Sequence, residues 1–301
     1  MMPVRIELLE NKGHCPDVTV LGIGEPGRKA VSKYPCPAYG EHHWGIGTLT
    51  LCDDDAFQHK RYPKVTTPKD SPRYLAECRK QICEIIQNTG DLFVIADINK
   101  DPDYDNAFRF ANLHRRNGRK GNRTILVNCG EEHTFASLEL QDVFDLIVNI
   151  HQCSNAYRPV EMLLSDMYTQ VIGLDAADVD GILKRTPEMI FYEEVLTDSN
   201  QLKNVASKIK TIFSGKYLGE PTYNGLLFCL VPLSEGLELV ENAYEVLTEM
   251  LIDGDLMVQM GCHDDEQDNS ITLAVMCGRE WPVEKHPETD FQGIEDVPLD
   301  F

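Results

Sequence analysis

Basic residues are scarce in this chain. Its 301 residues include 28 Lys and Arg against 49 Asp and Glu, which gives a formal net charge of −21. Nucleic acid and anionic lipid repel so acidic a protein, and neither is an expected partner. The charge favours basic proteins or cations as partners, or it serves solubility alone.

Long apolar runs are absent as well. No stretch approaches the ~18–20 apolar residues of a membrane helix, so we expect no direct insertion into a membrane. The first eleven residues include Arg5, Glu7 and Glu10, which is unlike a signal peptide, and we expect a cytoplasmic protein. With 42% hydrophobic residues the chain can bury a substantial core, in one large domain or two medium ones.

The ten cysteines include no CxxC pair. Cys229 and Cys277 lie in apolar runs, as buried free thiols of a cytosolic protein do. His42-His43 and residues 262–265 carry metal-ligand side chains, but neither group has a recognisable ligand spacing. The sequence therefore predicts no metal site.

The first half of the chain alternates between strand and helix patterns. Residues 91–98 are nearly all apolar, as expected for a parallel strand that is covered on both faces. The other strands are predicted at 17–22, 47–52, 123–129 and 145–150, with helices at 72–89 and 106–116. This order predicts an α/β fold with a doubly wound, mostly parallel sheet, whose ligands bind at the carboxyl ends of the strands.

The second half predicts a smaller α/β domain. A helix is predicted at 159–172, followed by strands at 188–196, 225–232, 255–261 and 270–278 and by helices at 199–213 and 237–251. The predicted organisation is a Rossmann-like domain at 1–158, a connecting helix and acidic loop at 159–185, an α/β domain at 186–281 and a tail at 282–301.

The order of these segments resembles the FtsZ/tubulin superfamily over nearly the whole chain. The resemblance lies in residues 91–129, 144–150, 173–179 and 223–249. It implies a GTPase-like first domain joined by a central helix to a smaller second domain. An unrelated Rossmann-like enzyme is the alternative.

The resemblance implies a vestigial nucleotide pocket. In this family a glycine-rich turn after the first strand approaches the phosphates, and here Gly22, Gly24 and Gly27 stand in that place. Asp55 and Ala56 match the family's polar turn after the second strand. A tight turn between strand and helix is the alternative interpretation of the three glycines.

The strongest departure from the family follows residues 91–98, where the glycine-rich phosphate loop is replaced. The replacing residues include Asn99, Lys100, Asp101, Asp103 and Asp105, with no glycine. Two like unit charges ~4 Å apart repel by about 1 kcal/mol even in bulk water, and several times more near a protein surface. We therefore expect no family-like GTP binding, although GTP or GDP with Mg²⁺ stays possible, and we expect an acidic loop with a helix beginning at Asn106.

Two further features follow from the resemblance. Asp175 and Asp178 match the acidic loop with which one FtsZ subunit contacts the nucleotide of the next, and two carboxylates can position water. Asp175 could instead cap the following helix, or the loop could pack against another subunit without chemistry. In the tail, Asp296, Pro298 and Phe301 resemble the peptide by which FtsZ binds adaptor proteins, or the tail packs on its own body.

These observations favour an FtsZ-like cytoskeletal or cell-division-related protein that assembles with itself or with FtsZ and is not an active enzyme. The alternatives are a GTPase with a remodelled phosphate loop, which would use Asp175 and Asp178, and a protein that binds a small molecule or cation in the old pocket.

Overall fold

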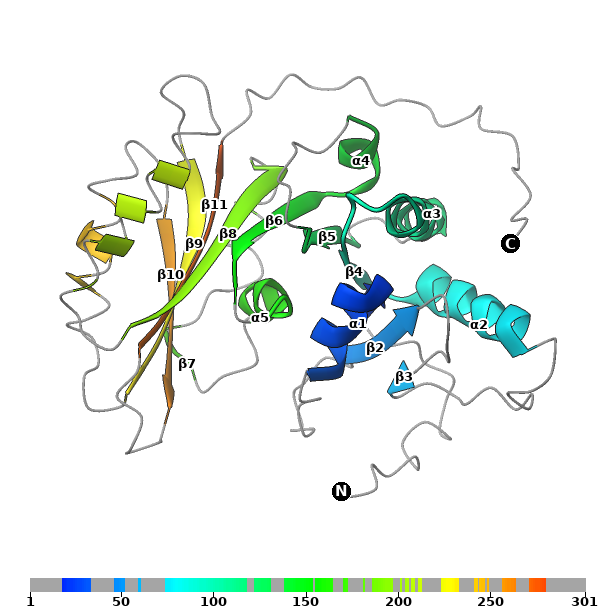
Figure 1. Ribbon diagram of the computed structural model, residues 1–301, viewed down its shortest axis with the longest axis horizontal. Helices are drawn as coiled ribbons and strands as arrows, with labels where there is room; N and C mark the ends of the chain where they lie inside the picture. The colour runs from blue at the N-terminus through cyan, green and yellow to red at the C-terminus, as the bar shows by residue number, and fades with distance from the viewer. Residues whose placement is uncertain are drawn as a thin grey trace.

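The computed structural model describes residues 18–33, 46–51, 59–60, 74–117, 122–130, 138–153, 155–164, 170–172, 181, 186–196, 223–232, 256–263 and 271–279, with single residues and short groups at 201–212 and 241–248. Its strands form one eleven-stranded sheet (Figure 1).

The first half supplies six strands and five helices of the described chain. The strands are β1 (Val18–Ile23), β2 (Ile46–Leu51), β3 (His59–Lys60), β4 (Asp91–Ala96), β5 (Thr124–Asn128) and β6 (Leu146–Gln152). The helices are α1 (Gly24–Lys33), α2 (Tyr74–Asn88), α3 (Asp101–Asn117), α4 (Leu138–Val143) and α5 (Arg158–Leu164). The second half adds β7 (Gln170–Ile172), β8 (Glu188–Leu196), β9 (Tyr223–Pro232), β10 (Leu256–His263) and β11 (Ile271–Arg279).

The sheet order is β3-β2-β1-β4-β5-β6-β8-β11-β9-β10-β7. All neighbours from β2 to β8 are parallel, whereas β11 runs antiparallel to both β8 and β9. The predicted α/β class with a mostly parallel sheet is confirmed. The pairing of β6 with β8 makes the sheet continuous between the two halves, and the predicted domain boundaries stay predictions.

Apolar side chains alternate between the two faces of the central strands. Phe93 and Ile95 of β4 pack on the side of α1 and α5, while Leu92 and Val94 pack against α2, α3 and α4 (Figure 1). Both faces are therefore covered, which explains why this strand is almost entirely apolar in sequence. The core on the α5 side continues into β8, β9 and β11.

The order of strands reverses direction at β1, which lies between β2 and β4. Connections from β1 and from β4 therefore leave the sheet on opposite sides. In open α/β sheets ligands bind beyond the carboxyl ends of the strands at such a switch point. The turn into α1 and the segment between β4 and α3 meet at this place.

Two predicted elements differ from the structure. Residues 170–172 were predicted to be helical but form strand β7, in which Ile172 pairs with Met260 of β10. Short apolar runs fit a helix or a strand equally well. Here pairing with β10, about ninety residues further along the sequence, makes the run a strand. The helix α3 begins at Asp101, so the prediction of an acidic loop up to Asn106 is wrong.

No helix in the described part of the chain is long and apolar enough to cross a membrane.

His114 of α3 fixes that helix to the sheet from a buried position. Only 1% of its surface is exposed, and its two ring nitrogens lie 2.7 Å from the carbonyl oxygen of Gly90 and 2.8 Å from the hydroxyl of Thr124. A carbonyl only accepts, so Nε2 carries the proton and the Thr124 hydroxyl donates to Nδ1. Burial lowers the pKa of His114, which keeps the ring neutral in the folded protein.

This histidine predicts an acid-sensitive contribution to stability. Because its folded pKa lies below the ordinary 6.5, the contribution is complete above that pH and is lost as the pH falls through the folded value. Urea unfolding from pH 7.5 to pH 5 should show a fall in the free energy of unfolding, of at most about 1.4 kcal/mol per pH unit from this group. The fall should be smaller in His114→Gln and unchanged in His151→Gln, which alters an exposed histidine. An identical pH profile for wild type and His114→Gln would contradict this assignment.

Candidate functional site

We call residues 22–27, 97–105 and 128–130 the switch-point edge. They lie at the carboxyl ends of β1, β4 and β5, which are neighbours in the sheet. Here β1 passes directly into α1, whereas four residues separate β4 from α3.

Gly24 is the first residue of α1 and has a φ of 66°, which non-glycine residues rarely adopt. A Cβ on Gly24 would lie 2.2 Å from Oδ2 of Asp103. One turn further, a Cβ on Gly27 would lie 2.2 Å from the carbonyl oxygen of Ile95 in β4. Both glycines are thus required by close approach of α1 to β4 and α3, which supports the interpretation of a tight turn.

The sequence contains a signal for the early start of α3. The Lys100 carbonyl accepts from the N–H of Tyr104 at 2.9 Å, so the first helical residue is Asp101. Proline in the first turn and acidic residues around it are both typical of a helix N-terminus. Pro102 between Asp101 and Asp103 is such a pattern, although the comparison with a phosphate loop obscures it.

Asp103 occupies the centre of the switch-point edge. Asp103 is 8% exposed, and its carboxylate lies beside Gly24. The N-terminus of a helix carries a partial positive charge and is where a protein commonly binds phosphate. At the N-terminus of α1 the neighbouring negative group is therefore a carboxylate of the chain itself.

Asp97 forms an ion pair with Lys100, the only basic residue among residues 97–105. Its Oδ2 lies 3.1 Å from Nζ of Lys100, and its Oδ1 accepts from the backbone N–H of Asn99 at 3.2 Å. The hydrogen bond to Asp97 and its charge raise the pKa of Lys100. The ammonium group on which a phosphate would depend here is thus already paired with a carboxylate.

Asn128 at the end of β5 holds the backbone on either side of the edge. Its Oδ1 accepts from the N–H of Gly130 at 3.1 Å and from that of Ile98 at 3.4 Å. Beside it, burial and the charge of Asp97 raise the pKa of the Cys129 thiol to about 12. This thiol stays protonated near neutral pH and is a poor nucleophile.

The structure brings together all predicted site residues that it describes. These are Gly22, Gly24, Gly27, Asn99, Lys100, Asp101, Asp103 and Asp105. Asp55, Ala56, Asp175, Asp178, Asp296, Pro298 and Phe301 lie outside the described residues. Asp97 and Asn128 were missed, and their signal is a polar residue next to the end of a buried strand.

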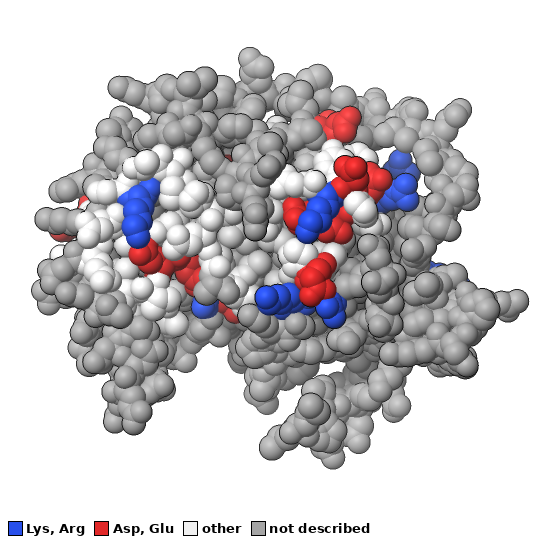
Figure 2. Space-filling view, in the orientation of Figure 1, with Lys and Arg blue, Asp and Glu red and all other residues white. Residues whose placement is uncertain are grey.

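The charges on this edge do not form a patch of one sign. Figure 2 shows acidic and basic side chains next to one another over the region of α1 and α3. One exposed pair there is Arg28 with Glu25, within the first turns of α1. The described residues contain no group of three or more His, Cys, Asp or Glu that could hold a metal ion.

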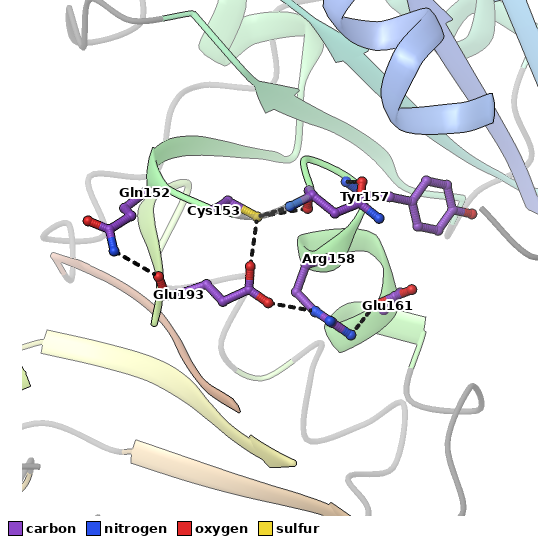
Figure 3. Close-up of polar contacts among 7 residues, drawn as sticks. Gln152, Cys153, Tyr157, Arg158, Glu161 and Glu193 are labelled. Atoms are coloured by element: carbon purple, nitrogen blue, oxygen red, sulfur yellow. Dashed lines mark hydrogen bonds and ion pairs between the residues drawn. The ribbon is translucent and has the colours of Figure 1, made fainter. Parts of the chain in front are cut away.

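A second polar cluster joins α5 to β8 (Figure 3). Arg158 donates from Nε to Oε1 of Glu193 at 2.9 Å and from Nη1 to Oε2 of Glu161 at 2.6 Å. The thiol of Cys153 donates to Oε2 of Glu193 at 3.3 Å, and burial together with that carboxylate raises the pKa of Cys153. The cluster thus holds a helix against the sheet and presents no activated nucleophile.

A shallow cavity of about 440 Å³ lies near this cluster, lined by residues that include His151, Tyr192, Lys208 and Ile212. The charge of Lys208 in this lining is balanced, because its Nζ lies 2.8 Å from Oε1 of Glu194. The lining that the structure describes therefore offers a small apolar surface, and its ammonium group is shared with a carboxylate.

Comparison with solved structures gives the fold. The chain is similar to a point mutant of FtsZ from M. jannaschii (14% identity, 91% of this chain and 93% of that chain, TM-score 0.64). It is also similar to an empty FtsZ dimer from M. jannaschii (14% identity, 92% of this chain and 92% of that chain, TM-score 0.56). A third similar structure is a GTPγS-form protofilament of TubZ from Bacillus thuringiensis serovar israelensis (10% identity, 92% of this chain and 91% of that chain, TM-score 0.52). The chain thus has an FtsZ/tubulin-like fold, as its sequence predicted.

The sequence itself matches no family model and no curated protein.

The contact of Asp103 with Gly24 predicts a coupled effect on stability. Gly24→Ala should lower the free energy of unfolding by at least ~1–2 kcal/mol, because the left-handed backbone is strained and the methyl group displaces a carboxylate. In an Asp103→Ala background the same substitution should cost less, since only the backbone strain remains. Urea unfolding of the four proteins measures this coupling.

The matched control is Gly181→Ala, because a Cβ at that position meets no atom within 4 Å. It should not destabilise the protein. Equal costs of Gly24→Ala with and without Asp103 would mean that the two residues do not touch.

Proposed function

We propose that this chain, which has the FtsZ/tubulin-like fold, is a cytoplasmic, cytoskeletal or cell-division-related protein that acts by assembling with itself or with FtsZ. We further propose that it does so without the GTP binding of that family. The similarity to solved structures of an FtsZ dimer and a TubZ protofilament supports the first part. Asp175 and Asp178 would then contact the next subunit without catalysing hydrolysis.

The carboxylate of Asp103 beside Gly24 is the observation that carries the second part. A phosphate placed at the N-terminus of α1 would meet this negative charge in a largely buried position, where charges interact more strongly than in water. It would also meet α3, whose first turn bears side chains in place of the bare glycine backbone that wraps a phosphate. Both features support the proposal that the chain does not hold a nucleoside triphosphate as the family does.

We also propose that the tail binds an adaptor protein. Asp296, Pro298 and Phe301 supply an acidic group, a rigid dihedral and an apolar anchor. A peptide of residues 288–301 should capture the adaptor, and Phe301→Ala should weaken capture. Loss of stability on truncation after Pro282, with no change in any interaction, would instead make the tail structural.

Assembly without nucleotide is the outcome that tests the proposal. Sedimentation velocity over a range of protein concentrations should show larger species, in the same proportion with and without GTP and Mg²⁺. Calorimetry with GTP or GDP should give no binding heat, and phosphate release should not exceed a protein-free blank.

An FtsZ that is known to hydrolyse GTP serves as the positive control under the same conditions. Phosphate release above the blank that Asp178→Ala abolishes would establish the alternative, a GTPase with a remodelled loop. A chain that remains monomeric at all concentrations, both alone and when mixed with FtsZ, would contradict the assembly proposal.

A further inference from the structure

Three buried polar side chains cross the interior of the sheet from the switch-point edge to β8. Asn128 is fully buried at the end of β5, and Asn149 of β6 and Glu188 of β8 are 4% and 3% exposed. Asn128 and Asn149 are register partners on neighbouring strands, and Glu188 begins the next strand. Burying such groups is costly unless they are hydrogen-bonded, so their partners are informative.

These side chains form one continuous chain of hydrogen bonds. Nδ2 of Asn149 donates to Oε1 of Glu188 at 2.6 Å, and Nδ2 of Asn128 donates to Oδ1 of Asn149 at 2.8 Å. Oδ1 of Asn128 then accepts from the backbone N–H groups of Gly130 and Ile98. Donors and acceptors therefore alternate in one direction over three strands.

Two backbone donors fix the direction of this series of hydrogen bonds at Asn128, and Glu188 fixes it at the other end. A carboxylate accepts hydrogen bonds and cannot donate them, so it selects the orientation of the Asn149 amide that presents nitrogen toward it. That orientation presents the Asn149 oxygen to Asn128, which in turn presents the Asn128 oxygen to the switch-point edge. Either amide could otherwise rotate by half a turn, and a rotated Asn128 would face two backbone donors with a donor of its own.

We propose that Glu188 is a positioning residue for the switch-point edge, acting through Asn149 and Asn128 on the backbone at Ile98 and Gly130. The inference goes beyond the proposed function and does not depend on it. Through these hydrogen bonds, Glu188 in the second half of the polypeptide would hold the backbone of the segment between β4 and α3 in place. That segment carries Asp97 and Lys100, and Asp103 follows in the first turn of α3.

Strand β11 packs against Glu188, at the end of this series of hydrogen bonds. A Cβ on Gly278 would lie 2.1 Å from the carbonyl oxygen of Glu188 and 2.5 Å from Cγ2 of Thr186. The backbone of Glu188 therefore has little room to shift toward β11, which keeps its carboxylate within hydrogen-bonding distance of the Asn149 amide. Movement of β8 relative to β6 would be passed to the edge by the amides.

Amide hydrogen exchange of the full-length protein, followed by NMR, tests the proposal at the two N–H groups concerned. In Glu188→Leu, which removes the acceptor, the amides of Ile98 and Gly130 should exchange about tenfold faster relative to that of Val127 in β5. Glu188→Gln retains an acceptor oxygen and should keep both amides protected. If Glu188→Leu does not fold, Asn149→Ala interrupts the same chain one step closer and should give the same result.

The matched control is Thr19→Val, which removes another buried side-chain hydrogen bond, to Thr89, at the amino ends of β1 and β4. It should leave Ile98 and Gly130 unchanged relative to Val127. The proposal is wrong if, in Glu188→Leu and Asn149→Ala, these two amides change no more than Val127 does. It is also wrong if Thr19→Val affects them equally.

Discussion

The carboxylate of Asp103 against the first residue of α1 is the contact on which the switch-point edge depends. It requires a glycine at position 24 and places a negative charge where the dipole of α1 favours one. Gly27, which lets α1 approach the backbone of β4, brings the helix close enough for this contact. The first turn of α3 and the first turn of α1 therefore hold each other in place through one side chain.

The proposed loss of GTP binding rests on this contact. The sheet, the covering helices and the switch point match FtsZ-like structures along more than nine-tenths of the chain. A fold does not by itself carry a function, which depends on the groups present at the site. Here those groups are a buried carboxylate, an ammonium group paired with Asp97 and a thiol kept protonated by burial.

Local patterns in the sequence predicted most of the fold, and long-range contacts account for what they missed. Strand β8 has the predicted bounds, and the apolar run in β4 indicated a central parallel strand. The start of α3 was misplaced because the resemblance led us to expect a loop there, although Pro102 signalled a helix. The site residues Asn128, Asn149 and Glu188 depend on contacts between strands that no periodic pattern reveals.

The most direct test of this account is the binding of inorganic phosphate at the N-terminus of α1, followed by the NMR shifts of the Gly24 and Glu25 amides. We expect no saturable shifts in the wild-type protein, because the Asp103 carboxylate fills that position, and saturable shifts in Asp103→Ala, in which the position is open. Saturable phosphate binding by the wild-type protein at these amides, or its absence from both proteins, would contradict the account.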